Sequence, residues 1–266
     1  ISTLVVETVT STTIARLSPE QWQEWPVIPD IISQAAVDIY EHGLALGNNP
    51  HAYSKIGGCL ETPGYFLGPY DGNPDLYSLG EYVYLQEVID TFHGSHSRTS
   101  IAAGIGYSSA NVLTTFMSDP KLCESGETPL ACEVRIHQPS FAFISLGSND
   151  VYHQEAFSIN MRQILDFLVE HGVVPILISK ADNLEGDHAI NQEIARFAYE
   201  YDLPYWNFWR VVQPLPDQGL QEDGAHLTWA GPYFDDPERM KAAWPWRNLT
   251  ALQTLDAVWR GVTLIP

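Results

Sequence analysis

Basic residues are scarce in this chain of 266 residues, in which 13 Lys and Arg stand against 33 Asp and Glu, a formal net charge of −20 at pH 7. Such a charge repels nucleic-acid phosphates and anionic membrane surfaces, so neither is expected as the main partner. No apolar run approaches the roughly 18 residues of a membrane helix, which predicts no transmembrane segment. No His and Asp cluster has the spacing of metal ligands, so neither a metal nor another cofactor is expected.

Cysteine is also rare, with three residues in the whole chain. Cys123 and Cys132 bracket the segment CESGETPLAC, which a disulfide would stabilise by about 2 to 3 kcal/mol through chain entropy. A disulfide predicts an oxidising compartment and hence an exported protein. The N-terminus, ISTLVVETVTSTTIA, lacks the basic start of a secretory signal, so an export signal or membrane tether would have been removed. The alternative is a cytosolic protein with all three thiols reduced. If Cys123 and Cys132 form a disulfide, Cys59 is left without a cysteine to pair with.

The length fits one large α/β domain, and we find no internal repeat, low-complexity tract or linker. We therefore predict a single domain over residues 1–266, with residues 1–28 as an N-terminal arm packed on it. Nothing in the sequence indicates an oligomer, and a monomer is favoured.

Short, continuous apolar runs are typical of strands in a parallel sheet that is covered on both faces. Runs of this kind alternate with segments of helical period, which predicts a doubly wound α/β fold with a mainly parallel, five-stranded sheet. The irregular segment 62–75 is expected to be a surface loop. The predicted strands are 52–57, 100–106, 140–147, 173–179 and 203–208, and the predicted helices are 31–44, 80–93, 108–117, 153–171, 186–201 and 249–261.

Glycine-rich or polar clusters lie where three predicted strands end, and a fourth lies near the C-terminus. In an open α/β sheet the functional site lies beyond the carboxyl ends of the strands, which predicts that these clusters meet. The clusters are Gly57-Gly58-Cys59, residues 104–109 (GIGYSS), residues 146–150 (LGSND) and residues 223–228 (DGAHLT).

Together these clusters contain what acyl transfer requires. Cys59 occupies a turn before a predicted helix, where a helix N-terminus favours a thiolate nucleophile. The Cys59 and Gly106 amides and the Asn149 side chain are predicted to form an oxyanion hole, in which each donor is typically worth about 3 kcal/mol. His226 is the candidate base, and Asp223, three residues earlier, is the group that orients it.

Each of these residues also has an ordinary structural explanation. A free cysteine is commonly a buried core residue, and the glycines would form turns. Asn149 would cap a helix beginning near Val151, Asp223 would cap another, and His226 would be a solvated surface residue. Further polar residues at the predicted end of the fourth strand are possible pocket residues: Lys180, Asp182 and Asn183.

The four clusters resemble the conserved blocks of the SGNH (GDSL-type) hydrolases, in order, from about residue 51 to about residue 231. Gly57-Gly58-Cys59-Leu60 stands where the family has G-D-S and an apolar residue, and Gly106 matches the glycine of block two. Residues 147–150 match G-x-N-D, and residues 223–228 match D-x-x-H-L-T. The resemblance implies a flavodoxin-like three-layer αβα fold, a catalytic triad and an oxyanion hole. It also implies hydrolysis of lipid or aryl esters, thioesters or O-acetylated carbohydrates.

The chain also resembles a subgroup of exported proteins from filamentous, often heat-loving bacteria. It departs from the family at two positions, because Cys59 replaces the nucleophilic serine and Gly58 replaces the aspartate. The leading hypothesis is a hydrolase with a Cys59-His226-Asp223 triad that acts on a small-molecule, lipid or carbohydrate acyl ester. One alternative is a binding module that kept the cleft and lost turnover, and another is an engineered Ser→Cys change at position 59.

Overall fold

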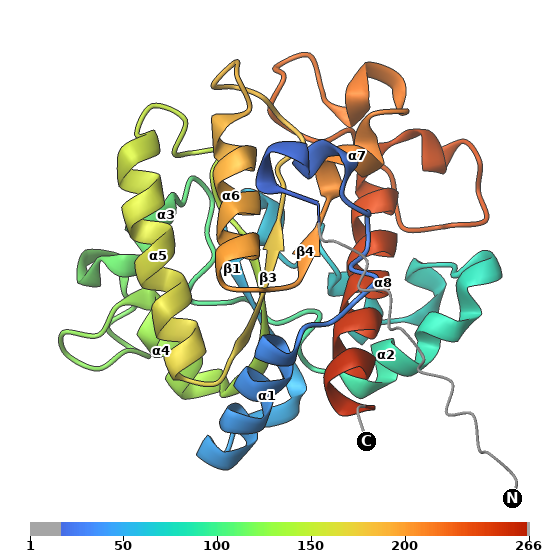
Figure 1. Ribbon diagram of the computed structural model, residues 1–266. Coiled ribbons are helices and arrows are strands. Elements are labelled where there is room, and N and C mark those ends of the chain that lie inside the picture. The colour runs from blue at the N-terminus through green and yellow to red at the C-terminus, as the bar shows by residue number, and fades with distance from the viewer. Residues whose placement is uncertain (1–16, 265–266) are drawn as a thin grey trace, which may run out of the picture.

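The computed structural model describes residues 17–264, so the first part of the predicted arm, residues 1–16, lies outside the described residues (Figure 1). The chain alternates helices with parallel strands. The strands are β1 (Asn49–Gly57), β2 (Pro139–Ser145), β3 (Val174–Ile178) and β4 (Tyr205–Trp206). The α-helices are α1 (Gln34–Leu46), α2 (Gln86–Thr91), α3 (Ser109–Leu113), α4 (Pro129–His137), α5 (Gln154–Glu170), α6 (Ala189–Glu200), α7 (Phe208–Val212) and α8 (Ala243–Thr263).

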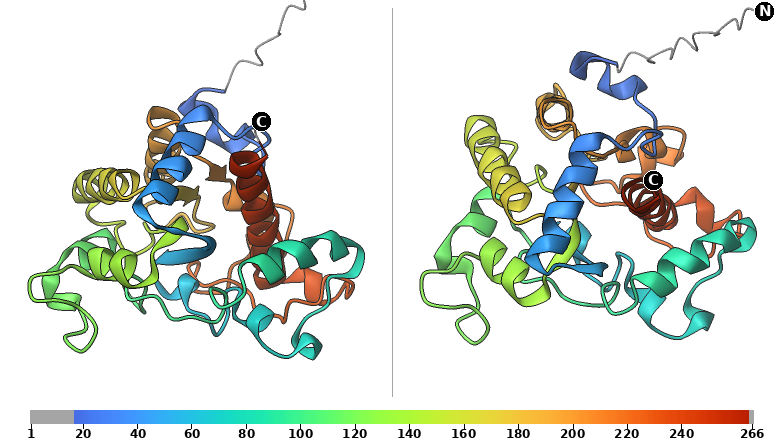
Figure 2. Two further views of the ribbon diagram at one scale, coloured as in Figure 1. Left: turned by 90° about the horizontal axis from the view of Figure 1, so that it is seen from below. Right: turned by 60° about the horizontal axis from the view of Figure 1, so that its bottom comes forward.

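The four strands form one parallel sheet in the order β1-β2-β3-β4. Helices α5 and α6 lie on one side of the sheet and α8 lies on the other (Figure 1). Both views in Figure 2 also show α5 and α8 on opposite sides of the strands. On α1, Tyr40 stacks on Phe141 of β2, with ring centroids 5.5 Å apart. The predicted α/β fold with a covered parallel sheet is confirmed.

The sheet has four strands, so the prediction of a fifth strand at residues 100–106 is wrong. This segment pairs with β1 at one isolated bridge between Gly57 and Ala103, where Gly104 N donates to Gly57 O over 3.1 Å. The backbone donors before the bridge go to side chains instead. Ile101 N donates to the Glu133 carboxylate at 2.9 Å, and Ala102 N donates to Ser100 Oγ at 3.1 Å. A ladder therefore cannot continue along this segment.

Several element boundaries also differ from the predictions. The predicted helix 80–93 begins as a 3-10 helix, Gly80–Leu85, and the predicted helix 108–117 divides into α3 and the 3-10 helix Thr115–Met117. Helix α8 begins at Ala243 rather than at residue 249. Helix α4 was not predicted, although it has the signals of a helix start. Thr128 Oγ1 accepts a hydrogen bond from Ala131 N at 3.2 Å, and proline occupies its first position.

The segment 62–75, predicted to be a surface loop, contributes to the core. It contains the 3-10 helix Gly68–Asp71 and the start of the 3-10 helix Pro74–Leu76, and Phe66 and Leu67 are fully buried. The Leu67 amide donates to Asn248 Oδ1 on α8 over 2.7 Å, so an apolar pair and a specific hydrogen bond hold the loop inward.

The described part of the N-terminal segment packs against α6 and the start of α7. Trp22, in the 3-10 helix Pro19–Glu24, is buried, and its ring centroid lies 4.9 Å from that of Trp209. Asn207 Nδ2 donates to the carbonyls of Trp22 and Trp25 at 2.8 and 3.2 Å. These hydrogen bonds join the segment to the residue that follows β4.

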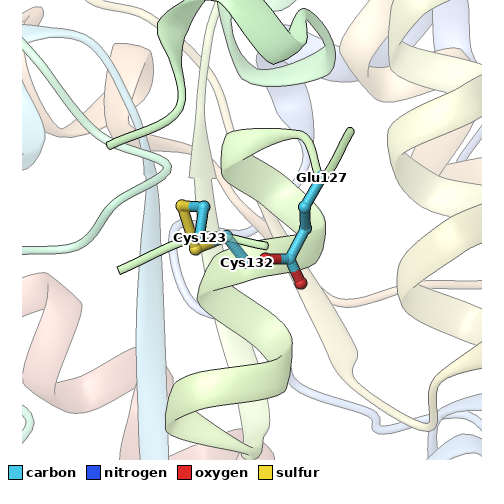
Figure 3. A group of neighbouring side chains, drawn as sticks. All are labelled: Cys123, Glu127 and Cys132. Carbon is cyan, nitrogen blue, oxygen red and sulfur yellow. A yellow bond between two sulfur atoms is a disulfide. The ribbon is translucent and has the colours of Figure 1, made fainter. Parts of the chain in front are cut away.

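The predicted disulfide is present between Cys123 and Cys132, whose Cα atoms are 5.2 Å apart (Figure 3). Cys132 lies on α4 and Cys123 in the preceding loop, so the bond ties this loop to the helix. Among residues 17–264, no helix combines the length and apolarity needed to cross a membrane.

Candidate active site

Cys59 lies at the carboxyl end of β1, where the sequence predicted it. Gly58 is extended, with φ −84° and ψ −152°, and Cys59 begins the 3-10 helix Cys59–Glu61. The thiol is free and half-buried. Thr62 closes the turn, because its backbone N–H and its Oγ1 both donate to the Cys59 carbonyl, at 3.2 and 2.8 Å. The 3-10 helix after Cys59 has three residues, so its dipole offers a thiolate little support.

A surface hollow at the ends of β1 and β2 brings together residues from three of the predicted clusters. Cys59 and Asn149 both line it, which places the candidate nucleophile and one candidate oxyanion donor at the same site. Lys180, from the end of β3, also lines the hollow. The full lining is Gly58, Cys59, Leu60, Tyr107, Ser145, Leu146, Gly147, Ser148, Asn149 and Lys180. His226, Asp223 and Gly106 lie outside this set.

The Asn149 amide is held beside the nucleophile turn. Its Nδ2 donates to the Tyr107 carbonyl at 2.9 Å, which leaves the second N–H of the amide for another acceptor. A Cβ atom on Gly58 would lie 3.2 Å from this nitrogen, so the missing side chain makes room for the amide. Helix α5 begins at Gln154, so Asn149 does not cap it. Gly106 is exposed in the adjacent turn, where Tyr107 N donates to Gly104 O at 3.1 Å.

The loop that carries Asn149 is fixed by its buried neighbour Asp150. This carboxylate accepts hydrogen bonds from Ser109 N at 3.0 Å and from Ser109 Oγ at 2.6 Å. Burial raises the pKa of Asp150, while the bonds from Ser109 oppose the rise. The bonds join the third cluster to Ser109, which is the last residue of the second cluster and the first of α3. The sequence did not predict this link.

His226 and Asp223 form the predicted pair on an exposed loop. His226 Nδ1 lies 2.6 Å from Asp223 Oδ2, and the two side chains are 59% and 49% exposed. Asp223 Oδ1 accepts hydrogen bonds from Ala225 N and His226 N at 3.0 and 2.9 Å. Hydrogen bonds from the His226 and Ala225 backbones and from the imidazole lower the pKa of Asp223 to about 2. The carboxylate therefore stays ionised and holds the ring in one orientation.

The possible pocket residues after β3 have different positions. Lys180 Nζ is buried between two carboxylates, Asp182 at 2.6 Å and Glu185 at 2.5 Å. Asp182 is also buried, and its carboxylate accepts a hydrogen bond from Ser148 Oγ at 2.6 Å. This bond connects the third cluster to the loop after β3. Asn183 Oδ1 accepts from His188 N at 2.9 Å within its own loop. Of the three predicted residues, Lys180 alone lines the hollow.

A buried ion pair behind the nucleophile turn was missed from the sequence. Glu61 is fully buried, and its Oε1 accepts a hydrogen bond from Nη2 of Arg247, a buried residue on α8. Burial raises the pKa of Glu61 to about 7, although Arg247 acts in the opposite direction. The sequence signal for this pair was a charged residue among mainly apolar neighbours, Glu61 in GGCLE and Arg247 in AWPWRNL.

One side-chain group has the composition of a metal site. Cys123, Glu127 and Cys132 lie close together, as Figure 3 shows. The two sulfur atoms are bonded to each other and offer no thiolate to a cation. The Glu127 carboxylate is engaged by Arg135, whose Nε and Nη2 donate at 2.7 and 2.8 Å. While the disulfide is intact, this group is structural.

No family model matches the sequence, and no curated protein matches it. Among solved structures, the chain is similar to a protein from Desulfitobacterium hafniense DCB-2 assigned to the G-D-S-L lipolytic family, with 12% identity and a TM-score of 0.46. That match covers 77% of this chain and 99% of the other. A GDSL-like lipase from Bacteroides thetaiotaomicron VPI-5482 is 15% identical with a TM-score of 0.46, over 84% and 98% of the chains. The fold assignment therefore rests on the strand order and helices of this chain itself.

Proposed function

We propose that this protein is an SGNH-type hydrolase of acyl esters, with Cys59 as the nucleophile, His226 as the base and Asp223 as its orienting group. One observation carries the proposal: Cys59 and the Asn149 amide line one hollow at the carboxyl ends of the strands. The His226–Asp223 pair, at 2.6 Å, supports it, because a carboxylate at Nδ1 leaves Nε2 as the basic nitrogen of the ring. The order of the four sequence clusters agrees with this assignment.

In the proposed reaction, Nε2 of His226 accepts the Cys59 thiol proton while Nδ1–H donates to Asp223. The thiolate attacks the ester carbonyl carbon, and the resulting oxyanion is bound by the Cys59 and Gly106 amides and by Asn149. His226 then gives its proton to the departing alcohol, which leaves a thioester on Cys59. His226 next deprotonates water, which attacks the thioester carbonyl carbon, and the C–S bond breaks to release the acid. His226 returns its proton to the Cys59 sulfur, which restores the thiol.

The proposed substrate is a short-chain ester, a lipid ester or an O-acetylated carbohydrate, as the resemblance to the SGNH hydrolases implies. The proposed reaction needs no cofactor. We further infer an exported, monomeric protein of one domain with an N-terminal arm, like the exported bacterial subgroup that it resembles. The Cys123–Cys132 disulfide supports export, because such bonds persist in oxidising compartments.

A second candidate is a catalytically silent protein that binds a glycan or an acyl ligand in the same hollow. Two observations favour it: His226 lies outside the residues that line the hollow, and the family's aspartate and serine are Gly58 and Cys59 here. This candidate predicts measurable ligand binding without product. It also predicts that Cys59→Ser restores no activity.

Hydrolysis of short-chain p-nitrophenyl esters separates the two candidates. The hydrolase predicts turnover by the parent protein, loss of at least about a hundredfold in Cys59→Ala and in His226→Ala, and retained or improved turnover in Cys59→Ser. Mass spectrometry of the parent after incubation with ester should reveal a thioester on Cys59. If all four proteins hydrolyse alike at background and no thioester forms, the hydrolase is excluded.

A further inference from the structure

The buried pair Glu61–Arg247 connects the nucleophile turn to the end of the neighbouring strand. Glu61 is the last residue of the 3-10 helix that Cys59 begins, and its Oε1 accepts a hydrogen bond from Arg247 Nη2. The same Nη2 donates to Ser145 Oγ at 2.9 Å. Ser145 ends β2 and pairs in register with Gly57. One guanidinium on α8 therefore bonds both the nucleophile turn and the end of β2.

The packing around this pair leaves little room for another arrangement. A Cβ atom on Gly57 would lie 2.4 Å from the Ser145 carbonyl oxygen and 2.7 Å from Glu61 Cγ. Only glycine at position 57 lets the Glu61 side chain pass inward beneath the turn. The Arg247 guanidinium lies 4.8, 5.3 and 5.0 Å from the ring centroids of Phe66, Trp206 and Phe208, which shield it from water.

We infer that Arg247 is a positioning residue for the reaction: through its hydrogen bonds to Glu61 and Ser145 it fixes the Cys59 turn against the end of β2. This inference rests on the proposed role of Cys59 as the nucleophile. Arg247 acts from behind the turn and does not touch the substrate. Cys59 is the free cysteine of the chain, so its reactivity can be measured without any ester.

The test is the rate at which iodoacetamide alkylates Cys59 in the folded protein at pH 7. We expect Arg247→Met to speed alkylation about tenfold, because the half-buried thiol is freed when both hydrogen bonds are lost, and Arg247→Lys, which can still bond one partner, to speed it less than about threefold. The matched control is Arg98→Met, which breaks another Arg–Glu pair, that of Arg98 with Glu133 on α4, and neither residue lines the hollow. It should leave the alkylation rate within twofold of the parent.

Unchanged or slower alkylation in folded Arg247→Met overturns the inference. If that variant does not fold, the double variant Glu61→Leu/Arg247→Met, which removes both members of the buried pair, is measured with the same expectations. Faster alkylation in a protein that hydrolyses no ester would uphold this inference and defeat the proposed function.

Discussion

His226 Nδ1 lies 2.6 Å from Asp223 Oδ2, and the other carboxylate oxygen of Asp223 accepts hydrogen bonds from the Ala225 and His226 backbones. The loop thus sets the direction of the carboxylate, and the carboxylate sets the direction of the imidazole. A pair with this exposure contributes little to folding. Its geometry is useful mainly for directing Nε2 and for keeping the proton on Nδ1.

The first prediction concerns this pair. Asp223→Asn should lower kcat for an ester by about a hundredfold or more, because an amide N–H facing Nδ1 favours the tautomer with its proton on Nε2. The melting temperature should stay within about 2 °C of the parent, since the side chain is exposed. Steady-state kinetics with a p-nitrophenyl ester, together with a thermal melt, checks both points. Unchanged kcat would mean that Asp223 does not orient the base.

The second prediction concerns the space at Gly58. A methyl group there would lie 3.2 Å from Asn149 Nδ2, so Gly58→Ala should displace the amide and lower kcat about tenfold with little change in KM. Gly64→Ala is the matched control, because a Cβ atom at Gly64 meets nothing within 4 Å. Equal kinetics for the two variants would remove Asn149 from the proposed oxyanion hole.

The third prediction concerns acid stability. His96 is buried, with Nδ1 2.8 Å from Tyr53 Oη and Nε2 2.9 Å from the Ile89 carbonyl, so the neutral ring can accept from the hydroxyl and donate to the carbonyl. Burial lowers the pKa of His96 from 6.5 to about 4 in the folded protein. Between these pH values the unfolded chain holds more protons, so acidification from pH 6.5 to pH 4 should cost up to about 3 kcal/mol of unfolding free energy.

Urea titrations from pH 7 to pH 4 test this effect. His96→Gln should be less stable than the parent at pH 7, yet lose less stability on acidification, because the buried ionisable ring is gone. The exposed residue His51 provides the control, and His51→Gln should retain the acid sensitivity of the parent. A parallel loss of stability in parent and His96→Gln would show that other groups cause it.

The fourth prediction concerns the disulfide. Replacing both Cys123 and Cys132 with serine should lower the free energy of unfolding by about 2 to 3 kcal/mol, because the bond closes a short loop in the unfolded chain. Ester hydrolysis per folded molecule should not change, since the residues that line the hollow come from other segments. A loss of kcat in the folded double variant would place α4 in the function of the site.

The sequence by itself determined the elements whose signals are local. Continuous apolar runs predicted β2 and β3, and the spacing of Asp223 and His226 on one turn predicted their contact. The position of Cys59 after β1 and the disulfide around 123–132 followed from equally local patterns.

Only the tertiary structure decided what depends on partners far apart in the chain. Residues 100–106 have the composition of a strand, but Glu133 on α4 binds the Ile101 amide, and Ala102 N, which a ladder with β1 would need, donates to Ser100 Oγ. Glu61 and Arg247 are separated by 186 positions, and no periodicity relates them. Local sequence patterns indicate the backbone conformation of a segment and which of its faces is buried. A buried charge, by contrast, requires a partner that only folding brings within reach.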